Sequence, residues 1–452
     1  MKLLSYRTIS ALVLLSAGLF FASQFASAEP VSAGDSSAGA EKQPQMQEIS
    51  DALARFKDRD IDGTVKSLEA AVKKNPDLPP VYVLLAQIYS QANMAQGVVQ
   101  ALEKGVQNAP DDPEAYVILA QVALRDRRIT EAELLLTKAN LLLPKLEKNP
   151  KRKDALSPAV VGGLAQVYQD REDWATAKKY LEQWLKLVPK NAQALQQLAS
   201  VLFKQKDADG ALAKLKEAKA ADAKALTPEA VLALYYQQSG DKDSAKKWMA
   251  TALTKATDDL NTQLIAAQLS LENGQLEEAQ NRAAAALRID MTSLDAQIIR
   301  GLVALFQKDY RAAERYFEGA HLKSPGNFAA SNNLALALAE QKDEAKKRRA
   351  LEFASNNVQQ YQKTANAVEA ASTYGWVLYK LGQIDEADKA LTAAVSTGQS
   401  FSPDTAYYMA VVASEKNRKE EAKTLLKAAA KSTSPFTMKQ EAAALLEQLE
   451  RQ

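Results

Sequence analysis

Apolar and polar residues alternate along most of this chain with the period of an α-helix. Within residues 113–146, apolar side chains recur every three or four positions in two runs, and the charged stretch 125–128 lies between them. The runs contain Tyr116, Leu119, Ala120 and Ala123, and then Ala132, Leu136 and Ala139. One apolar stripe per run predicts two amphipathic helices joined by a short turn, each of which buries one face.

Small residues repeat along the chain at a constant interval of 34 positions. One series is Ala177, Ala211, Ala245, Ala279 and Ala313, and the parallel series is Ala165, Ala199, Ala233, Ala267 and Gly301. A small side chain at the same place in each of two helices is needed where neighbouring helices pack too closely for a larger one. The period therefore predicts an array of helix-turn-helix units.

Proline and glycine mark the ends of the predicted helices. Pro76, Pro110 and Pro144 stand 34 residues apart and end three units, because proline cannot continue a helix. Glycine lies in the turns at 239–241, 273–275 and 381–383, where it can adopt a left-handed conformation at little cost. A coiled coil, the alternative helical architecture, would instead show a seven-residue period without such turns.

The units resemble the tetratricopeptide repeat. Small residues at the eighth and twentieth positions of each unit carry the likeness, and residues 374–382, with the sequence Tyr-Gly-Trp-Val-Leu-Tyr-Lys-Leu-Gly, match closely. The resemblance implies an all-α, right-handed α-solenoid of about eleven repeats over residues 46–435. The units start near 45, 79, 113, 158, 192, 226, 260, 294, 328, 368 and 403. The ninth has Lys347 where a small residue is expected, and fits only if Ala350 follows a longer turn.

The N-terminus predicts export. Lys2 and Arg7 precede an apolar run over 9–22, and Ala-Ser-Ala at 26–28 offers the small-residue pattern of a cleavage site. Residues 1–28 are therefore predicted to be a secretory signal peptide of a periplasmic or secreted protein. The run is shorter than the roughly 20 residues of a membrane span, so we expect no span in the mature chain. An uncleaved anchor is the alternative.

The charge balance changes once this segment is set aside. Of the 57 basic side chains, Lys2 and Arg7 lie in it, which leaves 55 basic against 55 acidic side chains. A neutral mature chain predicts no nucleic-acid partner. Residues 29–45 are rich in Ser, Ala, Gly, Glu and Gln, too polar to bury much surface, and are predicted to be a flexible linker.

Two interruptions break the repeat period. A basic insertion at 145–157 is predicted to extend a helix and then loop out, either as a contact for an acidic partner or as a solvated surface insertion. An irregular segment at 356–367, which contains Asn, Gln and Tyr, is predicted to be a loop or a change of direction where the array could divide into two arms.

Catalytic chemistry has little support in the sequence. His321 is the single histidine and no cysteine is present, which excludes sites built on several histidines or on thiolates. No glycine-rich phosphate loop appears. Paired carboxylates such as Asp111 and Asp112 stand where helices begin, and their negative charge there interacts favourably with the helix dipole. The sequence predicts no enzyme activity, no metal and no cofactor. An enzyme would require carboxylates that converge in the groove.

Resemblance to the repeat family implies a partner-binding groove lined by the first helix of each unit. Inward positions of the early units are rich in amides, which can both donate and accept hydrogen bonds to an extended peptide. Inward positions of the late units are aromatic and would anchor a partner, unless these rings pack between neighbouring first helices. The predicted groove residues are Gln87, Gln121, Gln166, Gln268, Phe306, Trp376, Tyr379 and Tyr407.

Residues 436–452 are predicted to form a capping helix, because Ala442, Leu445, Leu446 and Leu449 make one apolar stripe. The late unit and this helix are similar to the C-terminal end of large exported repeat proteins of exopolysaccharide secretion. We therefore expect a non-enzymatic scaffold of the bacterial envelope that binds one or more protein partners. The alternative is an accessory component of exopolysaccharide or protein export that contacts glycan directly through its aromatic end.

Overall fold

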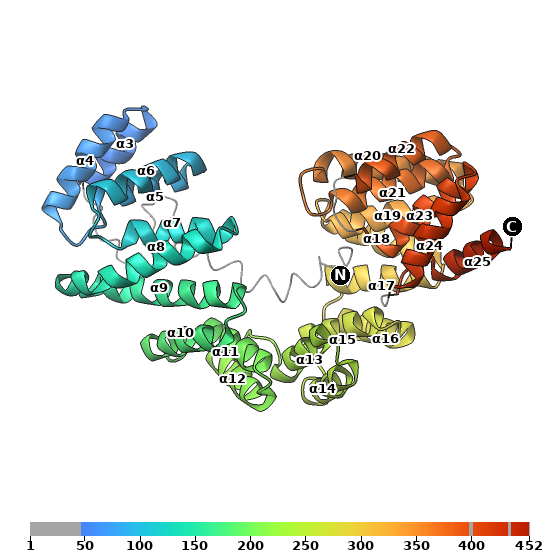
Figure 1. The fold of residues 1–452 in the computed structure, drawn as a ribbon, viewed down its shortest axis with the longest axis horizontal. Helices are drawn as coiled ribbons and strands as arrows, with labels where there is room; N and C mark the ends of the chain where they lie inside the picture. The colour runs from blue at the N-terminus through green and yellow to red at the C-terminus, as the bar shows by residue number, and fades with distance from the viewer. Residues whose placement is uncertain (1–46, 397–400, 433–434, 452) are drawn as a thin grey trace. The chain divides into compact units, whose positions relative to one another are not determined.

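The chain folds as an array of helices. The computed structural model describes residues 47–396, 401–432 and 435–451, and within these ranges it contains helices and no strand. The predicted signal peptide (1–28) and linker (29–45) lie outside the described residues. The helices form two compact units, which meet in sequence at Ala225 and Leu226. Each unit is an α-solenoid of helix pairs (Figure 1).

The first unit contains five pairs. They are α3 (Gln47–Lys57) with α4 (Ile61–Lys74), α5 (Val81–Gln91) with α6 (Ala95–Asn108), α7 (Glu114–Arg125) with α8 (Ile129–Leu142), α9 (Pro150–Asp170) with α10 (Trp174–Leu187), and α11 (Ala192–Lys204) with α12 (Ala208–Ala221). A short 3-10 helix, η1 (Leu143–Lys148), precedes α9.

The second unit contains six pairs and a final helix. The pairs are α13 (Pro228–Ser239) with α14 (Lys242–Lys255), α15 (Leu260–Glu272) with α16 (Leu276–Ile289), α17 (Leu294–Phe306) with α18 (Tyr310–Lys323), α19 (Phe328–Ala339) with α20 (Glu344–Tyr361), α21 (Ala367–Lys380) with α22 (Ile384–Val395), and α23 (Pro403–Glu415) with α24 (Lys419–Ala430). The final helix is α25 (Lys439–Glu450). We number the pairs of both units as repeats one to eleven.

Both series of small residues are buried where the two helices of a pair meet, which confirms the reason given for the 34-residue period. Gly301 shows how tight this contact is. A Cβ atom built on Gly301 would lie 2.6 Å from the ring of Phe317. Leu181, Leu215 and Met249 occupy the position of Phe317 in other pairs, so the larger ring is accommodated by removing the methyl group that faces it.

The turn between the helices of a pair has one conformation almost throughout. It contains one residue with positive φ in every described repeat except the ninth, and glycine holds this place in only three turns. Elsewhere the residue is polar, for example Lys206 at φ 69° and Lys308 at φ 60°. A left-handed conformation costs a non-glycine residue roughly 1–2 kcal/mol. The packing of the pair therefore imposes the left-handed residue of the turn, and glycine is only one of the residues that occupy this position.

The ninth repeat begins its second helix differently. No residue with positive φ stands between α19 and α20, and Ala350 is fully buried while Lys347 keeps part of its surface exposed. Ala350 therefore serves as the small residue of the second helix in the ninth repeat, three positions later than in the other repeats, as the sequence indicated. The prediction of an irregular segment at 356–367 is wrong for its first half, because α20 continues to Tyr361. The two units divide at 225, not here.

The basic insertion at 145–157 does not loop out. Its first residues form η1, the side chain of Asn149 then caps α9, and α9 begins at Pro150, so the insertion becomes extra helical turns. Lys145 pairs with the exposed Asp111 at 2.6 Å. The segment therefore contacts acidic residues of the preceding repeat in its own chain.

Arg152 makes the strongest of these contacts. Its Nη2 lies 2.8 Å from Asp112 and 2.7 Å from Glu114, and all three side chains are about 15% exposed. Burial raises the pKa of Glu114, and the charge of Arg152 opposes that rise. The guanidinium thus compensates two carboxylates that would otherwise be unpaired at the start of α7.

None of the described helices combines the length and the apolar character that a membrane crossing requires.

We expect Arg152→Ala to lower the free energy of unfolding by about 3 kcal/mol, because two nearly buried carboxylates lose their partner. Lys145→Ala, in an exposed ion pair of the same segment, should cost less than about 1 kcal/mol. Urea unfolding followed by circular dichroism measures both. Equal effects of the two substitutions would show that Arg152 contributes only as a surface charge.

Candidate partner-binding surfaces

First helices of successive repeats contact one another throughout the second unit, and at one place in the first. In the second unit α13, α15, α17, α19, α21 and α23 form an unbroken series of neighbours, and in the first unit α7 contacts α9. No successive second helices among the described residues pack to the same extent. We call the surface that the first helices of a unit present its inner surface.

Three predicted glutamines form a row on the inner surface of the first unit. Gln87, Gln121 and Gln166 lie on the successive first helices α5, α7 and α9, and each is half-buried. They occupy equivalent positions, and none of the three hydrogen-bonds another described residue. Their amide groups are available to a partner.

Gln268, predicted as a fourth member, is not available in the same way. It is 7% exposed, and its Nε2 donates to Glu272 at 2.9 Å. It lies on α15, in the second unit, so the predicted row of amides is limited to the first unit.

The aromatic end is a packed cluster. Trp376 is 2% exposed, with Tyr379 stacked at 5.1 Å and Tyr408 at 4.4 Å between ring centroids. Its Nε1 donates to Glu340 at 2.7 Å, and Lys380 lies over the ring while it pairs with Glu340. The prediction that Trp376 anchors a partner is therefore wrong in this conformation, because the ring faces are covered.

The structure does bring together three of the predicted aromatic residues. Tyr407, on α23, lies 5.8 Å from Trp376 and is 9% exposed, so it is also a core residue. Tyr379 and Phe306 are half-buried. Tyr408, which stacks most closely on the indole, was missed because it immediately follows Tyr407 and only one of them was assigned inward. The alternative, that these rings pack between neighbouring first helices, describes the cluster.

A part of the chain's own C-terminus lies on the inner surface of the second unit. Residues 435–438, here called the tail segment, precede α25 and are not helical. Phe436 and Met438 are buried, and Thr437 donates to Asp404 from its backbone N–H at 3.1 Å and from its hydroxyl at 2.6 Å. The capping helix itself begins at Lys439, three residues later than predicted.

Thr437 closes a small cavity whose walls come from four first helices. The cavity of about 50 Å³ is lined by Leu302 and Leu305 of α17, Asn333 and Leu336 of α19, Glu369, Ser372 and Thr373 of α21, and Ser402, Asp404, Thr405 and Tyr408 at the start of α23. The tail segment therefore sits where the inner positions of repeats eight to eleven converge.

Two carboxyl groups meet in this cavity. Burial, followed by the charge of Asp404, raises the pKa of Glu369 to about 8. Burial also raises the pKa of Asp404, although hydrogen bonds from Thr437 oppose that rise. This is the kind of convergence that an enzyme would require, but a cavity of about 50 Å³ holds little more than one or two waters.

Family models for the tetratricopeptide repeat match three stretches of the chain, residues 55–122, 163–225 and 300–352. These stretches include helix pairs of both units. The chain therefore contains tetratricopeptide repeats. No curated protein was found to match it.

Solved structures of similar proteins share little sequence with this tetratricopeptide repeat protein. A tetratricopeptide repeat protein from Parabacteroides merdae is 15% identical over 65% of this chain and 99% of its own, with a TM-score of 0.39. Yeast Tom70 is 16% identical over 90% of this chain and 95% of its own, also with a TM-score of 0.39. YrrB, described as having an unusual peptide-binding site, is 22% identical over 45% of this chain and 98% of its own, with a TM-score of 0.29. Likenesses this low carry no argument about function.

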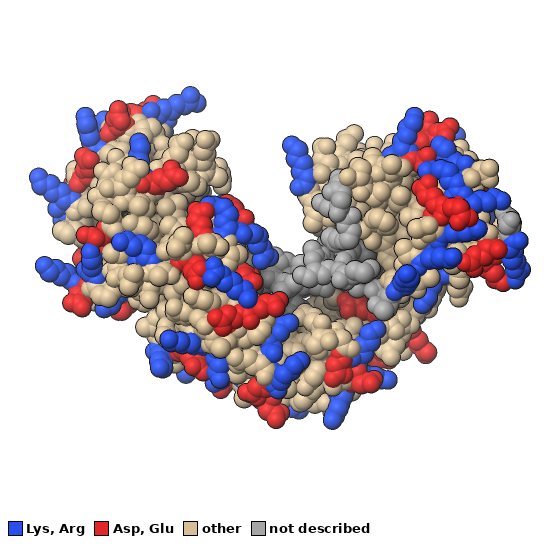
Figure 2. All heavy atoms as spheres, viewed as in Figure 1, with Lys and Arg blue, Asp and Glu red and all other residues tan. Residues whose placement is uncertain are grey.

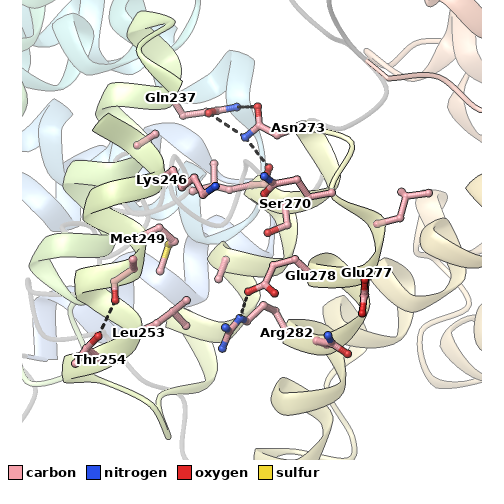
Figure 3. A pocket seen from close by; sticks show the side chains of 17 residues that line it. Gln237, Lys246, Met249, Leu253, Thr254, Ser270, Asn273, Glu277, Glu278 and Arg282 are labelled. Carbon is pink, nitrogen blue, oxygen red and sulfur yellow. Dashed lines mark hydrogen bonds and ion pairs between the residues drawn. The ribbon is translucent and has the colours of Figure 1, made fainter. Parts of the chain in front are cut away.

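The second unit also has a cleft on the side of its second helices, which the sequence analysis missed. It measures about 880 Å³ and lies between repeats six and seven, with Met249 and Leu253 on α14 and Leu276 on α16 (Figure 3). An ion pair between Glu278 and Arg282, 2.6 Å apart, stands on its α16 wall.

Charged side chains do not gather by sign. On the face shown in Figure 2, lysine and arginine are interspersed with aspartate and glutamate over both units. In the described part of the chain, no three His, Asp or Glu side chains are arranged to hold a metal ion.

We expect Trp376→Ala to lower the free energy of unfolding by about 3–5 kcal/mol, because it leaves a cavity inside the aromatic cluster. Trp248→Ala, at a half-buried tryptophan of α14, should cost less than half as much. Thermal and urea unfolding of both variants measure this difference. Unchanged stability of Trp376→Ala would contradict a core role.

Stability should fall as the pH rises because of Glu369. Between the usual pKa of 4.5 and the raised value of about 8, the folded chain keeps a proton that the unfolded chain releases. We expect Glu369→Gln to stabilise the protein by about 1–3 kcal/mol at pH 8, with the gain shrinking toward pH 4.5.

Unfolding at a series of pH values measures that gain. The exposed Glu386→Gln on α22 is the control and should show no such trend. A difference between Glu369→Gln and the unmodified protein that did not vary with pH would overturn the assignment.

Proposed function

We propose that this tetratricopeptide repeat protein is a non-enzymatic scaffold that binds extended segments of protein partners along its inner surfaces. The observation that carries the proposal is the row formed by Gln87, Gln121 and Gln166. Three amides at equivalent positions of successive first helices, without partners in the described chain, offer repeated donors and acceptors to one continuous ligand.

An extended polypeptide has the matching geometry. Packed helices lie about 8–10 Å apart, and an extended chain advances about 3.3 Å per residue, so a segment crosses one repeat in about three residues. Each glutamine can then pair with the backbone N–H and C=O groups of the segment. A hydrogen bond contributes about 0.5–1.5 kcal/mol net, so affinity is built from several repeats.

We place the scaffold in the bacterial envelope because of the predicted signal peptide at 1–28. A cysteine-free solenoid needs no disulfide to fold in an oxidising compartment. The similarity of the C-terminal end to proteins of exopolysaccharide secretion stays a prediction.

Polypeptide is favoured over glycan as the ligand. Direct glycan contact was expected at the aromatic end, but Trp376 and Tyr407 are buried in this structure and offer no open ring face to a sugar. An enzymatic role is disfavoured because the carboxyls of Glu369 and Asp404 meet in a cavity too small for a substrate.

The test is affinity purification of the mature protein from its native envelope after mild crosslinking, with bound proteins identified and retained glycan assayed. A triple variant carries Gln87→Ala, Gln121→Ala and Gln166→Ala. We expect the recovered protein partner to bind the triple variant at least tenfold more weakly, because the amide row is lost.

A matched triple variant changes Gln100, Gln107 and Asn140, which are exposed amides of second helices, to alanine. It should bind the partner as the unmodified protein does. Equal binding by both triple variants, or recovery of glycan without any protein, would overturn the proposal.

A further inference from the structure

The tail segment occupies the inner surface of the second unit as a ligand would. It enters after α24, and the connection from α24 to α25 is longer than the turns between other repeats, for example 324–327 between α18 and α19. Its buried side chains, Phe436 and Met438, belong to the aromatic core cluster that contains Trp376 and Tyr408. The tail segment is therefore held by side chains that the partner-binding surface of a repeat array would use.

Recognition at this place is specific as well as apolar. Asp404 accepts both the backbone N–H and the hydroxyl of Thr437, a pair of contacts that fixes the register of the segment. A carboxylate acceptor strengthens such bonds relative to a neutral one. An apolar residue on either side of the threonine then fills the space beside it.

The tail segment is also placed where it can be replaced. It follows the last helix pair, so its release leaves the eleven pairs intact. A cleft of about 430 Å³ lies beside it, between Phe436 and Thr437 on one side and Phe306 and Lys308 on the other. The α25 helix is otherwise held through Ala442 and Leu449, and through ion pairs of Glu441 with Lys308 and of Glu450 with Lys427.

The closed arrangement carries an electrostatic cost. Glu369 and Asp404 line the same cavity, and burial raises the pKa of both carboxyls. Thr437 donates two hydrogen bonds to Asp404 and thereby opposes this cost, and an incoming segment with a threonine at the same place could do so equally.

We propose that the inner surface of repeats eight to eleven is a second peptide-binding site, which the chain's own residues 435–438 occupy and thereby close to partners. The ligand is an extended segment with a threonine between two large apolar residues, as in Phe436-Thr437-Met438. The proposal rests on the proposed function in that both use inner surfaces for polypeptide, but it involves different repeats and different residues.

The experiment uses the full chain and a fluorescent peptide with the sequence of residues 435–441. A latch variant, Phe436→Ala with Met438→Ala, weakens the internal competitor while the site itself is unchanged. We expect the latch variant to bind the peptide at least tenfold more tightly than the unmodified protein, by fluorescence anisotropy. A peptide with valine in place of threonine should bind the latch variant at least tenfold more weakly.

Control variants test whether the tighter peptide binding is specific to the side chains of Phe436 and Met438. Lys439→Ala with Gln440→Ala changes two exposed neighbours of the tail segment and should leave peptide binding as in the unmodified protein. Asp404→Asn in the latch variant should weaken binding of the threonine peptide more than that of the valine peptide, because valine keeps only the backbone N–H donor.

Hydrogen exchange provides a second measurement on the unmodified protein. Saturating peptide should speed the exchange of the backbone amides of Thr437 and Met438, because the tail segment is displaced. A folded latch variant that binds the peptide no better than the unmodified protein, together with unchanged exchange, would overturn the proposal.

The two proposals fail separately. The triple glutamine variant should bind this peptide normally, so loss of a partner in that variant reports only on the first unit. Conversely, failure of the peptide experiment leaves the amide row and its partner untouched.

Discussion

The close approach of two helices within each repeat is the constraint on which the rest of the structure depends. It explains why the small-residue series is buried and why Gly301 faces Phe317. It also sets the turn in every described repeat except the ninth, because helices in such contact are joined by one residue with positive φ whether or not that residue is glycine. The contact within the helix pair is thus repeated along the chain, and the repeats differ in their connections and in their surface residues.

Two departures from the period supply partners for carboxylates. The insertion before α9 places Arg152 against Asp112 and Glu114, and the long connection before α25 places Thr437 against Asp404. In both cases a segment outside the repeat pattern supplies the partner for carboxylates at the start of a first helix. These two irregular segments therefore provide the groups that pair with carboxylates of the repeats.

The inner surfaces of the two units differ in what they present. In the first unit, amides at equivalent positions keep part of their surface exposed and have no partners among the described residues. In the second unit, the aromatic residues at related positions pack with one another and with residues 435–438. The same scaffold geometry thus yields an open surface in one unit and a self-occupied surface in the other.

Helix pairs, their number and their small-residue contacts could be predicted from the sequence, because these depend on periodic patterns within about 34 neighbouring residues. The place of Gln87, Gln121 and Gln166 on successive first helices also follows from the repeat register, while their role in binding stays a prediction. The burial of Trp376, the pairing of Arg152 and the place of Thr437 were decided only by the tertiary structure. Each depends on contacts between residues of different repeats, and the local pattern carries no information about which side chains meet there.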